Sequence, residues 1–356
     1  MKEIDSILSK HIKENKTPSV QYVFFDRDSI TYSFQSGLAD IKNRRITTEN
    51  TTYNAYSVTK TFTALAVLQL AEHEKLDIEH PIKDYLPEFP YPEEITIKQL
   101  MSHSAGIPNP IPLSWIHLVE EHQPFDAETF FKKVFEKNKK TISRPNEKFA
   151  YSNLGYVLLG QLIEKVSGIS YEEYIRAHIL RPLGVDKTDL DFTIANTDQH
   201  AKGYLKKFSL LNVVLGFMIN KAKFLNSISE GKWISFKDNY VNGASYGGLI
   251  GTSNALVSYI QELLKANGKL ISDNYKKMLF SENHTTRKKA TGMCLSWFSG
   301  HLNGHQYFTH AGGGGGYYCE IRIYPDQGKG SVLLFNRTGI RDERFLDKLD
   351  KYFIKE

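Results

Sequence analysis

The sequence predicts an α+β fold with two lobes, because strand and helix patterns fall in separate parts of its 356 residues. Strand patterns occur near both chain ends, and the short turns between them favour antiparallel pairing. Helical patterns fill most of the middle. We therefore expect an antiparallel sheet flanked by N- and C-terminal helices, formed by residues 1–75 and 245–356, with an inserted all-helical lobe at 76–244.

The sheet lobe is predicted from alternating patterns and from turn residues. Helices are expected over 2–15 and 253–266, and from residue 341 to the end. Alternation of apolar and polar residues, bounded by glycine, asparagine or proline, predicts the strands. These strands are expected at 20–26, 29–36, 292–298, 305–310, 317–324 and 331–336.

The helix expected over 57–73 is apolar on more than one face, which is typical of a buried helix. Helices should dominate from there to about residue 190. Capping-box patterns mark the start of two of them, at Thr96 and at Ser170. Gly168 should end another. Residues 195–245 show no regular pattern.

Three short motifs follow one another along the chain and carry reactive groups. They are Ser57-Val-Thr-Lys60, Tyr151-Ser-Asn153 and His310-Ala-Gly312. The first two occur twice, so context must decide between the copies. Ser229 with Lys232 encloses a glycine and precedes no apolar run, and Tyr240 with Asn242 leads into a glycine-rich loop. We therefore favour the first copy of each motif.

Ser57 and Lys60 fit a nucleophile and its base. Ser57 lies at the start of the apolar helix, where free backbone N–H groups favour a developing anion. Residues three apart share a helix face, so the Lys60 amine is expected within reach of the Ser57 hydroxyl. Burial lowers the pKa of a lysine, and only the neutral amine can accept a proton from serine.

The other two motifs are expected to face the same cleft. Tyr151 and Asn153 lie where a loop enters a helix capped by Ser152 or Asn153. His310 opens a run of five glycines, Gly312 to Gly316, which leads into the strand at 317–324. Glycine in a strand suggests close approach of a ligand or another backbone.

At this point the chain resembles the serine β-lactamase and penicillin-binding-protein superfamily, in its class C-like branch of esterases and D-amino-acid peptidases. S-x-x-K belongs to that superfamily's signature. The resemblance covers roughly residues 15 to 340, with an interruption near 205 to 240, and implies the same two-lobed fold. Further matching stretches begin at Leu100, Tyr151, Arg181, Gly247 and Gly314.

The resemblance also implies roles for individual residues. Ser57 would form the acyl-enzyme, while Lys60 and Tyr151 would move protons. Asn153 would bind the acyl side of the substrate. The backbone N–H groups of Ser57 and Gly313 would form the oxyanion hole. His310 and Gly312 would complete the substrate-binding side of the cleft.

The resulting prediction is a serine hydrolase that acts on esters, amides or D-amino-acid peptides through acyl-Ser57. A DD-peptidase or β-lactamase is the alternative among enzymes, and a catalytically idle scaffold is the alternative outside them. His310 replaces the lysine of the best-known members, and imidazole binds a carboxylate less reliably than ammonium at neutral pH. His103 suggests a triad, but we expect it to be a hydrogen-bonded partner in a buried turn.

Composition limits the partners. The net charge of +5 comes from 45 basic and 40 acidic residues without long like-sign blocks, so we expect a small-molecule or short peptide substrate and no nucleic acid. No metal or cofactor motif occurs, and Cys294 and Cys319 are expected to be free buried thiols. The oligomeric state is left open.

The start of the chain does not fit a secretion signal, which predicts a cytoplasmic protein, or a periplasmic or secreted one if a leader has been removed. The apolar run at 208–219 is too short to span a bilayer. We expect it to be a core-facing helix; the alternative is a lid that walls the acyl pocket or touches a membrane surface.

Overall fold

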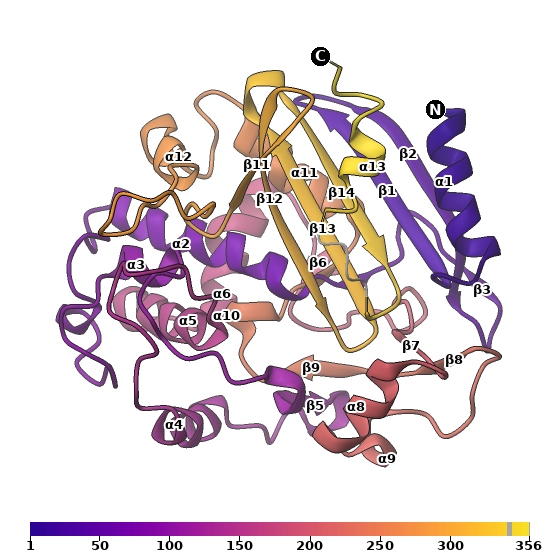
Figure 1. The fold of residues 1–356 in the computed structure, drawn as a ribbon, viewed down its shortest axis with the longest axis horizontal. Helices are drawn as coiled ribbons and strands as arrows, with labels where there is room; N and C mark the ends of the chain where they lie inside the picture. The colour runs from indigo at the N-terminus through magenta and orange to yellow at the C-terminus, as the bar shows by residue number, and fades with distance from the viewer. Residues whose placement is uncertain (340–343, 356) are drawn as a thin grey trace.

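The computed structural model describes residues 1–339 and 344–355. Its main sheet has seven strands in the order β11-β12-β13-β14-β1-β2-β3, and each neighbouring pair is antiparallel. Both chain ends contribute to it, and the two termini lie on the same side of the molecule (Figure 1). The strands are β1 (Ser19–Asp26), β2 (Ile30–Asp40), β3 (Arg45–Ile46), β11 (Phe298–Leu302), β12 (His305–Gly314), β13 (Tyr317–Tyr324) and β14 (Lys329–Phe335).

Helices cover both faces of the sheet because its strands are apolar on both sides. Val20, Tyr22 and Phe24 point to one face, where they pack with α1 (Lys2–Lys13) and with the C-terminal segment that contains α13 (Asp347–Asp350). Val23 and Phe25 point to the other face, which α11 (Ser253–Leu264) covers. This alternation follows the period of two in a strand. The α+β class and the antiparallel sheet predicted from the sequence are confirmed.

The segment inserted between the sheet halves consists mainly of helices, most of which lie to the left of the sheet and below it in Figure 1. The sequence predicted that this segment would be all helical. It also contains two short strand pairs, β5 with β9 and β7 with β8. The helices outside the sheet layers are α2 (Thr59–Glu72), α3 (Ile97–Met101), α4 (Ala127–Lys137), α5 (Asn153–Ser167), α6 (Tyr171–Ile175), α7 (Arg181–Leu183), α8 (Leu210–Met218), α9 (Lys221–Phe224), α10 (Ala244–Gly247) and α12 (Asp273–Leu279). The short strands are β4 (Tyr53–Asn54), β5 (Ile116–Leu118), β6 (Leu190–Asp191), β7 (Tyr204–Lys206), β8 (Trp233–Ser235), β9 (Asn239–Val241) and β10 (Ile250–Gly251).

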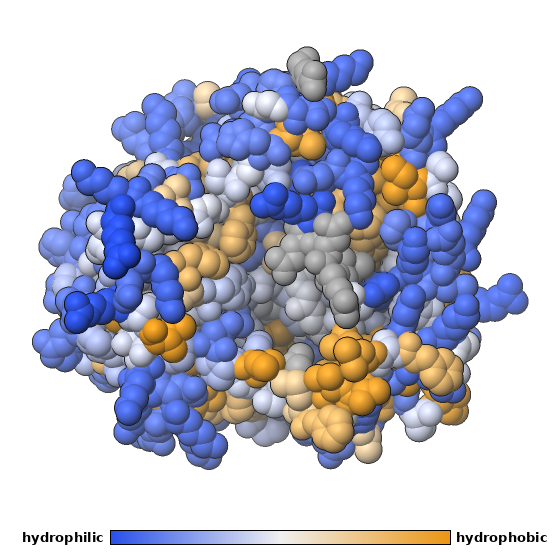
Figure 2. All heavy atoms as spheres, viewed as in Figure 1, coloured by the Kyte–Doolittle hydropathy of each residue, from blue (hydrophilic) through white to orange (hydrophobic). Residues whose placement is uncertain are grey.

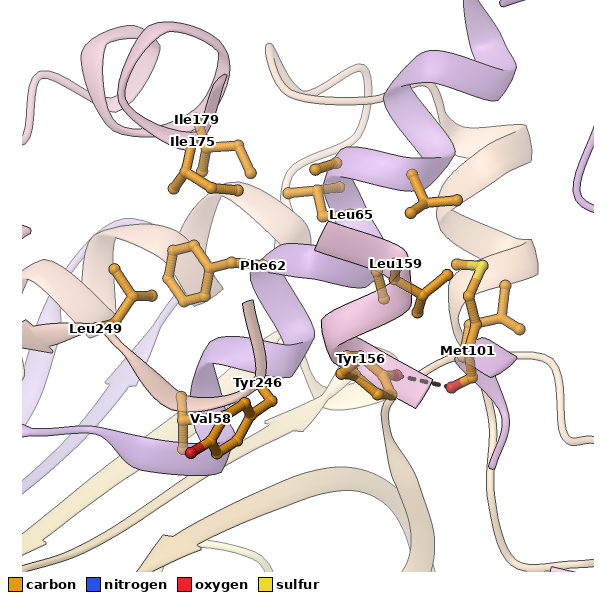
Figure 3. Close-up of a cluster of buried hydrophobic side chains, with 14 of the residues drawn as sticks. Val58, Phe62, Leu65, Met101, Tyr156, Leu159, Ile175, Ile179, Tyr246 and Leu249 are labelled. Atoms are coloured by element: carbon orange, nitrogen blue, oxygen red, sulfur yellow. Dashed lines mark hydrogen bonds between the residues drawn. The ribbon is translucent and has the colours of Figure 1, made fainter. Parts of the chain in front are cut away.

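Helix α2 is the buried centre of the molecule. Every residue from Thr59 to Ala71 is buried, as the apolar pattern on several faces predicted. Phe62 and Leu65 project from α2 among Tyr156, Leu159 and other side chains from surrounding helices (Figure 3). The hydroxyl of Tyr156 donates to the carbonyl of Met101 at 2.7 Å, which ties α5 to α3. A helix held on all sides can fix a reactive group at its start.

Local cap chemistry places the other predicted helix ends. Thr96 and Gln99 form the expected capping box of α3. Ser152 caps α5 by accepting from the Gly155 N–H, and Gly168 ends that helix with φ of 77°. These ends agree with the sequence analysis because they depend on neighbouring residues alone.

Two predicted elements of the sheet lobe differ. The strand expected at 292–298 is absent, because the Cys294 N–H donates to the Trp297 carbonyl and closes a turn in which Ser296 has φ of 71°. Strand β11 begins only at Phe298. The closing helix was expected from 341; residues 340–343 lie outside the described residues, and α13 is one short turn further on.

The cysteines and the helix lengths can also be compared with the sequence. Cys294 and Cys319 are buried and free, as predicted. No helix of the described residues is long and apolar enough to cross a membrane. Within the same residues, no group of three or more His, Cys, Asp or Glu side chains could hold a metal ion.

Candidate active site

Ser57 lies in a tight turn that leads into α2. Residues Tyr56–Val58 form one 3₁₀ turn, and α2 begins directly after it at Thr59. Tyr56 has φ of 45°, a left-handed conformation that is uncommon for a residue with a large side chain. Such strain is found where surrounding packing holds a functional turn. The Ser57 side chain faces a pocket.

Lys60 is the second residue of α2, three positions after Ser57, and is fully buried. Its Nζ is 3.0 Å from the Ser57 Oγ and donates to the Tyr246 carbonyl at 2.6 Å. Burial holds the pKa of this amine well below its usual range, so the neutral form is favoured. A neutral amine has a lone pair, which can accept the Ser57 proton across the same 3.0 Å contact.

The second motif enters the site from the loop before α5. The Tyr151 ring centre is 5.0 Å from the Lys60 Nζ and 4.2 Å from the ring centre of His103. The His103 Nδ1 accepts from the Ser152 N–H at 3.1 Å, so this buried histidine supports the loop that carries Tyr151. His103 itself has φ of 53°, and its turn is buried as expected.

Asn153 lies at the start of α5 and lines the same pocket as Ser57. Its backbone N–H and its Nδ2 both donate to the Oδ1 of Asn109, at 3.0 and 3.1 Å. With its Nδ2 engaged in this way, the side-chain amide has a fixed orientation. The geometry therefore brings Ser57, Lys60, Tyr151 and Asn153 together around one pocket.

Strand β12 passes against the Ser57 turn, and its glycines make this possible. A side chain at Gly312 would lie 2.1 Å from the Ala55 carbonyl oxygen and 2.7 Å from the Ser57 nitrogen. Gly312 is buried in this contact and does not line the pocket. Gly313 is exposed and lines the pocket beside Ser57. The two glycines therefore differ: one allows close packing, and the other borders the pocket.

His310 does not reach the pocket, unlike the predicted substrate contact. Its ring is fully buried, and its Nδ1 contacts the Ser296 carbonyl, to which it can only donate. The Nε2 is then the unprotonated nitrogen, and it has no hydrogen-bond partner among the described residues. Burial and the nearby Lys60 lower the pKa of His310 to about 3. This histidine is neutral and has no surface on which a substrate carboxylate could bind.

The pocket around Ser57 is open to solvent and has a mainly apolar lining. Its walls come from the Ser57 turn, the start of α5, the glycines of β12, and helix α8. None of the described residues that line it carries a charge. The apolar part of this lining includes Pro112, Ile116, Leu211, Leu215, Ile219, Phe236 and Val241.

Comparison with known proteins identifies the group to which this site belongs. The family model described as Beta-lactamase matches residues 4–352. The chain belongs to the Beta-lactamase family. The predicted superfamily resemblance is thereby confirmed, and the family is a serine hydrolase superfamily.

Individual members of the Beta-lactamase family are distant from this chain. Penicillin-binding protein 4* of Bacillus subtilis (strain 168) is 26% identical over 318 residues, which cover 86% of this chain and 66% of that protein. The chain spans about half (49%) of the length of other curated relatives that it matches.

Two solved structures show the same fold. The octameric penicillin-binding protein homologue from Pyrococcus abyssi has a TM-score of 0.82 at 24% identity, covering 99% of this chain and 77% of that one. The D-amino acid amidase from Ochrobactrum anthropi SV3, complexed with L-phenylalanine, has a TM-score of 0.75 at 18% identity, covering 99% and 98%.

The sequence analysis missed parts of this Beta-lactamase family site that only the fold brings together. Tyr246 supplies the carbonyl that Lys60 contacts, and its ring centre is 5.4 Å from the Lys60 Nζ. Asn109 fixes Asn153 from a proline-rich loop. A backbone carbonyl leaves no sequence signal, whereas the position of Asn109 between two prolines could have suggested a rigid polar loop.

The second copies of the two motifs make hydrogen bonds with residues other than Ser57 and Lys60. Ser229 accepts a hydrogen bond from Lys207 at 3.2 Å in the loop before β8. The Tyr240 hydroxyl accepts from the Ile194 N–H at 3.1 Å, and the Asn242 Oδ1 contacts the ring of His117 at 2.9 Å. The choice of the first copies agrees with this placement.

Proposed function

We propose that this chain is a serine hydrolase that forms an acyl-enzyme on Ser57 and prefers esters or amides without a free carboxylate, including those of D-amino acids. The observation that carries the proposal is the buried contact between the Lys60 Nζ and the Ser57 Oγ at 3.0 Å. A lysine kept neutral by burial beside a pocket serine has no evident structural benefit, since burying an amine is unfavourable. The arrangement suits proton removal from the serine.

In the proposed acylation step, the Ser57 Oγ attacks the substrate carbonyl carbon while its proton moves to the Lys60 amine. The carbonyl electron pair moves onto the oxygen, which the N–H groups of Ser57 and Gly313 would stabilise. The bond to the leaving group then breaks, and this group takes up a proton delivered through Lys60 or Tyr151. A water molecule releases the acyl group by the same steps with Ser57 as the leaving group.

The pocket lining supports uncharged substrates over those with a free carboxylate. The described lining residues hold no cation, and buried His310 is neutral well below physiological pH. Binding a carboxylate in an apolar pocket without a charged partner is costly. This argues against a DD-peptidase or β-lactamase, whose substrates carry such a group. A solved structure of the same fold is named a D-amino acid amidase, which is consistent with an amide substrate for this chain.

The test combines covalent labelling with a substrate panel. We expect a fluorophosphonate to add to Ser57, detected by mass spectrometry, and p-nitrophenyl esters or D-amino-acid amides to be cleaved faster than nitrocefin. Ser57→Ala should abolish labelling, and Lys60→Met should reduce turnover by roughly 10²-fold or more, since it removes the base. The duplicate motif provides the matched control, because Ser229→Ala and Lys232→Met should leave both readouts unchanged.

Two results would count against the proposal. An intact fold without any adduct or turnover would identify the chain as a non-catalytic binding protein. Rapid acylation by penicillin together with efficient nitrocefin cleavage would show that the apolar lining does not exclude carboxylates, and would favour the β-lactamase alternative.

A further inference from the structure

Helix α8 has two apolar faces, and only one of them is covered by protein. Leu211, Leu215 and the following Ile219 are spaced four residues apart, so they lie on one side of the helix. This inner side lines the Ser57 pocket and packs with Leu205 and Phe236. The segment was expected to be a core-facing helix, but Leu215 is the residue of α8 that is buried, and the inner side of the helix borders the pocket instead. A pocket wall needs only one apolar side.

The opposite side of α8 presents large apolar side chains to solvent. Phe208, directly before the helix, is 86% exposed, and Phe217 near its end is 88% exposed. Leu210, Val213 and Val214 lie between them and are also exposed. A cluster of hydrophobic side chains is visible on the lower right of the molecular face, where Figure 1 places α8 (Figure 2). A contiguous exposed apolar patch of this kind usually marks a binding surface.

The chain around this patch is positively charged. Residues 201–229 contain five lysines and no aspartate, glutamate or arginine. Lys206 and Lys207 directly precede Phe208, and Lys221 follows the helix. None of these three forms an ion pair with a carboxylate in the part of the chain that the structure describes. Their neighbours are a ring, a hydroxyl and a carbonyl, so the positive charge is not compensated.

The pKa of Lys206 supports this reading of the local charge. It is lowered first by partial burial and then by Arg337, Lys232 and Lys16. Three further cations therefore lie close enough to Lys206 to repel its proton. Lys223 differs, because Glu121 lies 2.6 Å from its Nζ and offsets its charge. The basic region thus centres on the Phe208 end of the patch.

We propose that the outer side of α8 docks the protein on the surface of an anionic phospholipid bilayer. Phe208 and Phe217 would enter the region between headgroups and acyl chains, while Lys206, Lys207 and Lys221 contact anionic headgroups. Aromatic side chains flanked by lysines are the composition that interfacial helices use. Juxtaposed lysines strengthen attraction to a negative lipid surface. This inference does not depend on the hydrolase proposal.

A second copy of the chain fits the same surface less well. Two-fold pairing of identical faces would bring the lysines of one copy against those of the other. Lysine is also depleted in protein–protein interfaces relative to the remaining surface. A bilayer with negative headgroups matches both the apolar patch and the charge around it.

The experiment is sedimentation of the full chain with vesicles of phosphatidylcholine alone and of phosphatidylcholine mixed with phosphatidylglycerol. We expect binding to the anionic vesicles that weakens as salt is added. The double variant Phe208→Ser with Phe217→Ser should bind at least roughly tenfold more weakly, since it removes the two most exposed apolar side chains of the patch. Lys206→Gln with Lys207→Gln should lose the preference for anionic vesicles.

Matched controls come from exposed positions elsewhere. Ile46→Ser on β3 removes an exposed apolar side chain, and Lys132→Gln with Lys133→Gln on α4 removes an adjacent lysine pair. Both should bind as the unaltered chain does. Because the substituted residues are exposed or, for Lys206, partly exposed, unfolding curves should coincide and exclude misfolding.

Three results would overturn the inference. The first is an absence of binding to both vesicle types. The second is binding that the phenylalanine variant leaves intact. The third is self-association of the unaltered chain, seen by analytical ultracentrifugation and removed by that same variant without vesicle binding, which would assign the patch to a second copy.

Discussion

Replacing Gly312 by alanine tests whether strand β12 holds the Ser57 turn in place. The added methyl carbon would lie 2.1 Å from the Ala55 carbonyl oxygen, 2.7 Å from the Ser57 nitrogen and 3.1 Å from the Val58 nitrogen. All three atoms belong to the backbone, so no side-chain rotation can relieve the contact. The strand and the turn would have to separate by roughly 1 Å to restore ordinary contact distances.

This separation has two measurable consequences. Overpacking of a well-packed interior lowers the free energy of unfolding by about 1–3 kcal/mol. Displacing a reactive group by about 1 Å can lower the rate by about 10²-fold. We therefore expect Gly312→Ala to remain folded, to be moderately less stable, and to react with a fluorophosphonate about a hundred times more slowly.

The assay pairs denaturant unfolding with the rate of Ser57 labelling. Gly313→Ala is the matched control for stability, because the nearest atoms to its added carbon lie at 3.8 Å and nothing has to move. Its free energy of unfolding should equal that of the unaltered chain. Unchanged stability together with an unchanged labelling rate in Gly312→Ala would refute the close contact between β12 and the Ser57 turn.

Three further predictions follow from other buried contacts. Ser152→Ala removes the cap of α5 and should lower the free energy of unfolding by about 1 kcal/mol in urea titrations, whereas an unchanged value would show that the cap contributes nothing. As pH falls from 6.5 toward 3, the unfolded His310 takes up a proton that the buried ring cannot, so stability falls by roughly 1.4 kcal/mol per pH unit from this residue. His310→Gln should therefore show a shallower loss of stability in acid, and an identical slope would contradict its buried neutral state. Arg322→Met should cost about 3–5 kcal/mol in the same titrations, because buried Glu320 and Asp350 lose the cation that lies between them; a neutral effect would mean that both carboxyls are protonated.

Sequence patterns predicted the helix ends and strands correctly where they depend on neighbouring residues alone. The cap of α3 at Thr96 and the stop of α5 at Gly168 depend on side chains within one turn. The strand expected at 292–298 failed for a tertiary reason. The alternation of Met293, Leu295 and Trp297 comes from burial of a turn, and all three side chains are fully or almost fully buried without forming a strand.

In the candidate site, too, local contacts were predicted from the sequence and distant ones were not. The three-residue spacing of Ser57 and Lys60 was enough to predict their contact, because the 3₁₀ turn that holds Ser57 runs directly into α2. The place of His310 could not be derived from its motif. On β12 the His310 ring points toward the Ser296 carbonyl. The chain turn at 294–297 that presents this carbonyl was not predicted from the sequence. The partners Tyr246 and Asn109 are likewise brought in from distant parts of the chain.

Burial explains both what the site can do and what it excludes. Removing Lys60 from water favours the neutral amine that a serine needs as its base, and removing His310 from water eliminates the charge that a carboxylate would need. The proposed preference for substrates without a carboxylate thus rests on the same packing that would activate Ser57. A variant that exposes this interior to solvent should raise the pKa of Lys60 toward its usual range, and fluorophosphonate labelling at neutral pH should then be slower, because less of the amine is neutral.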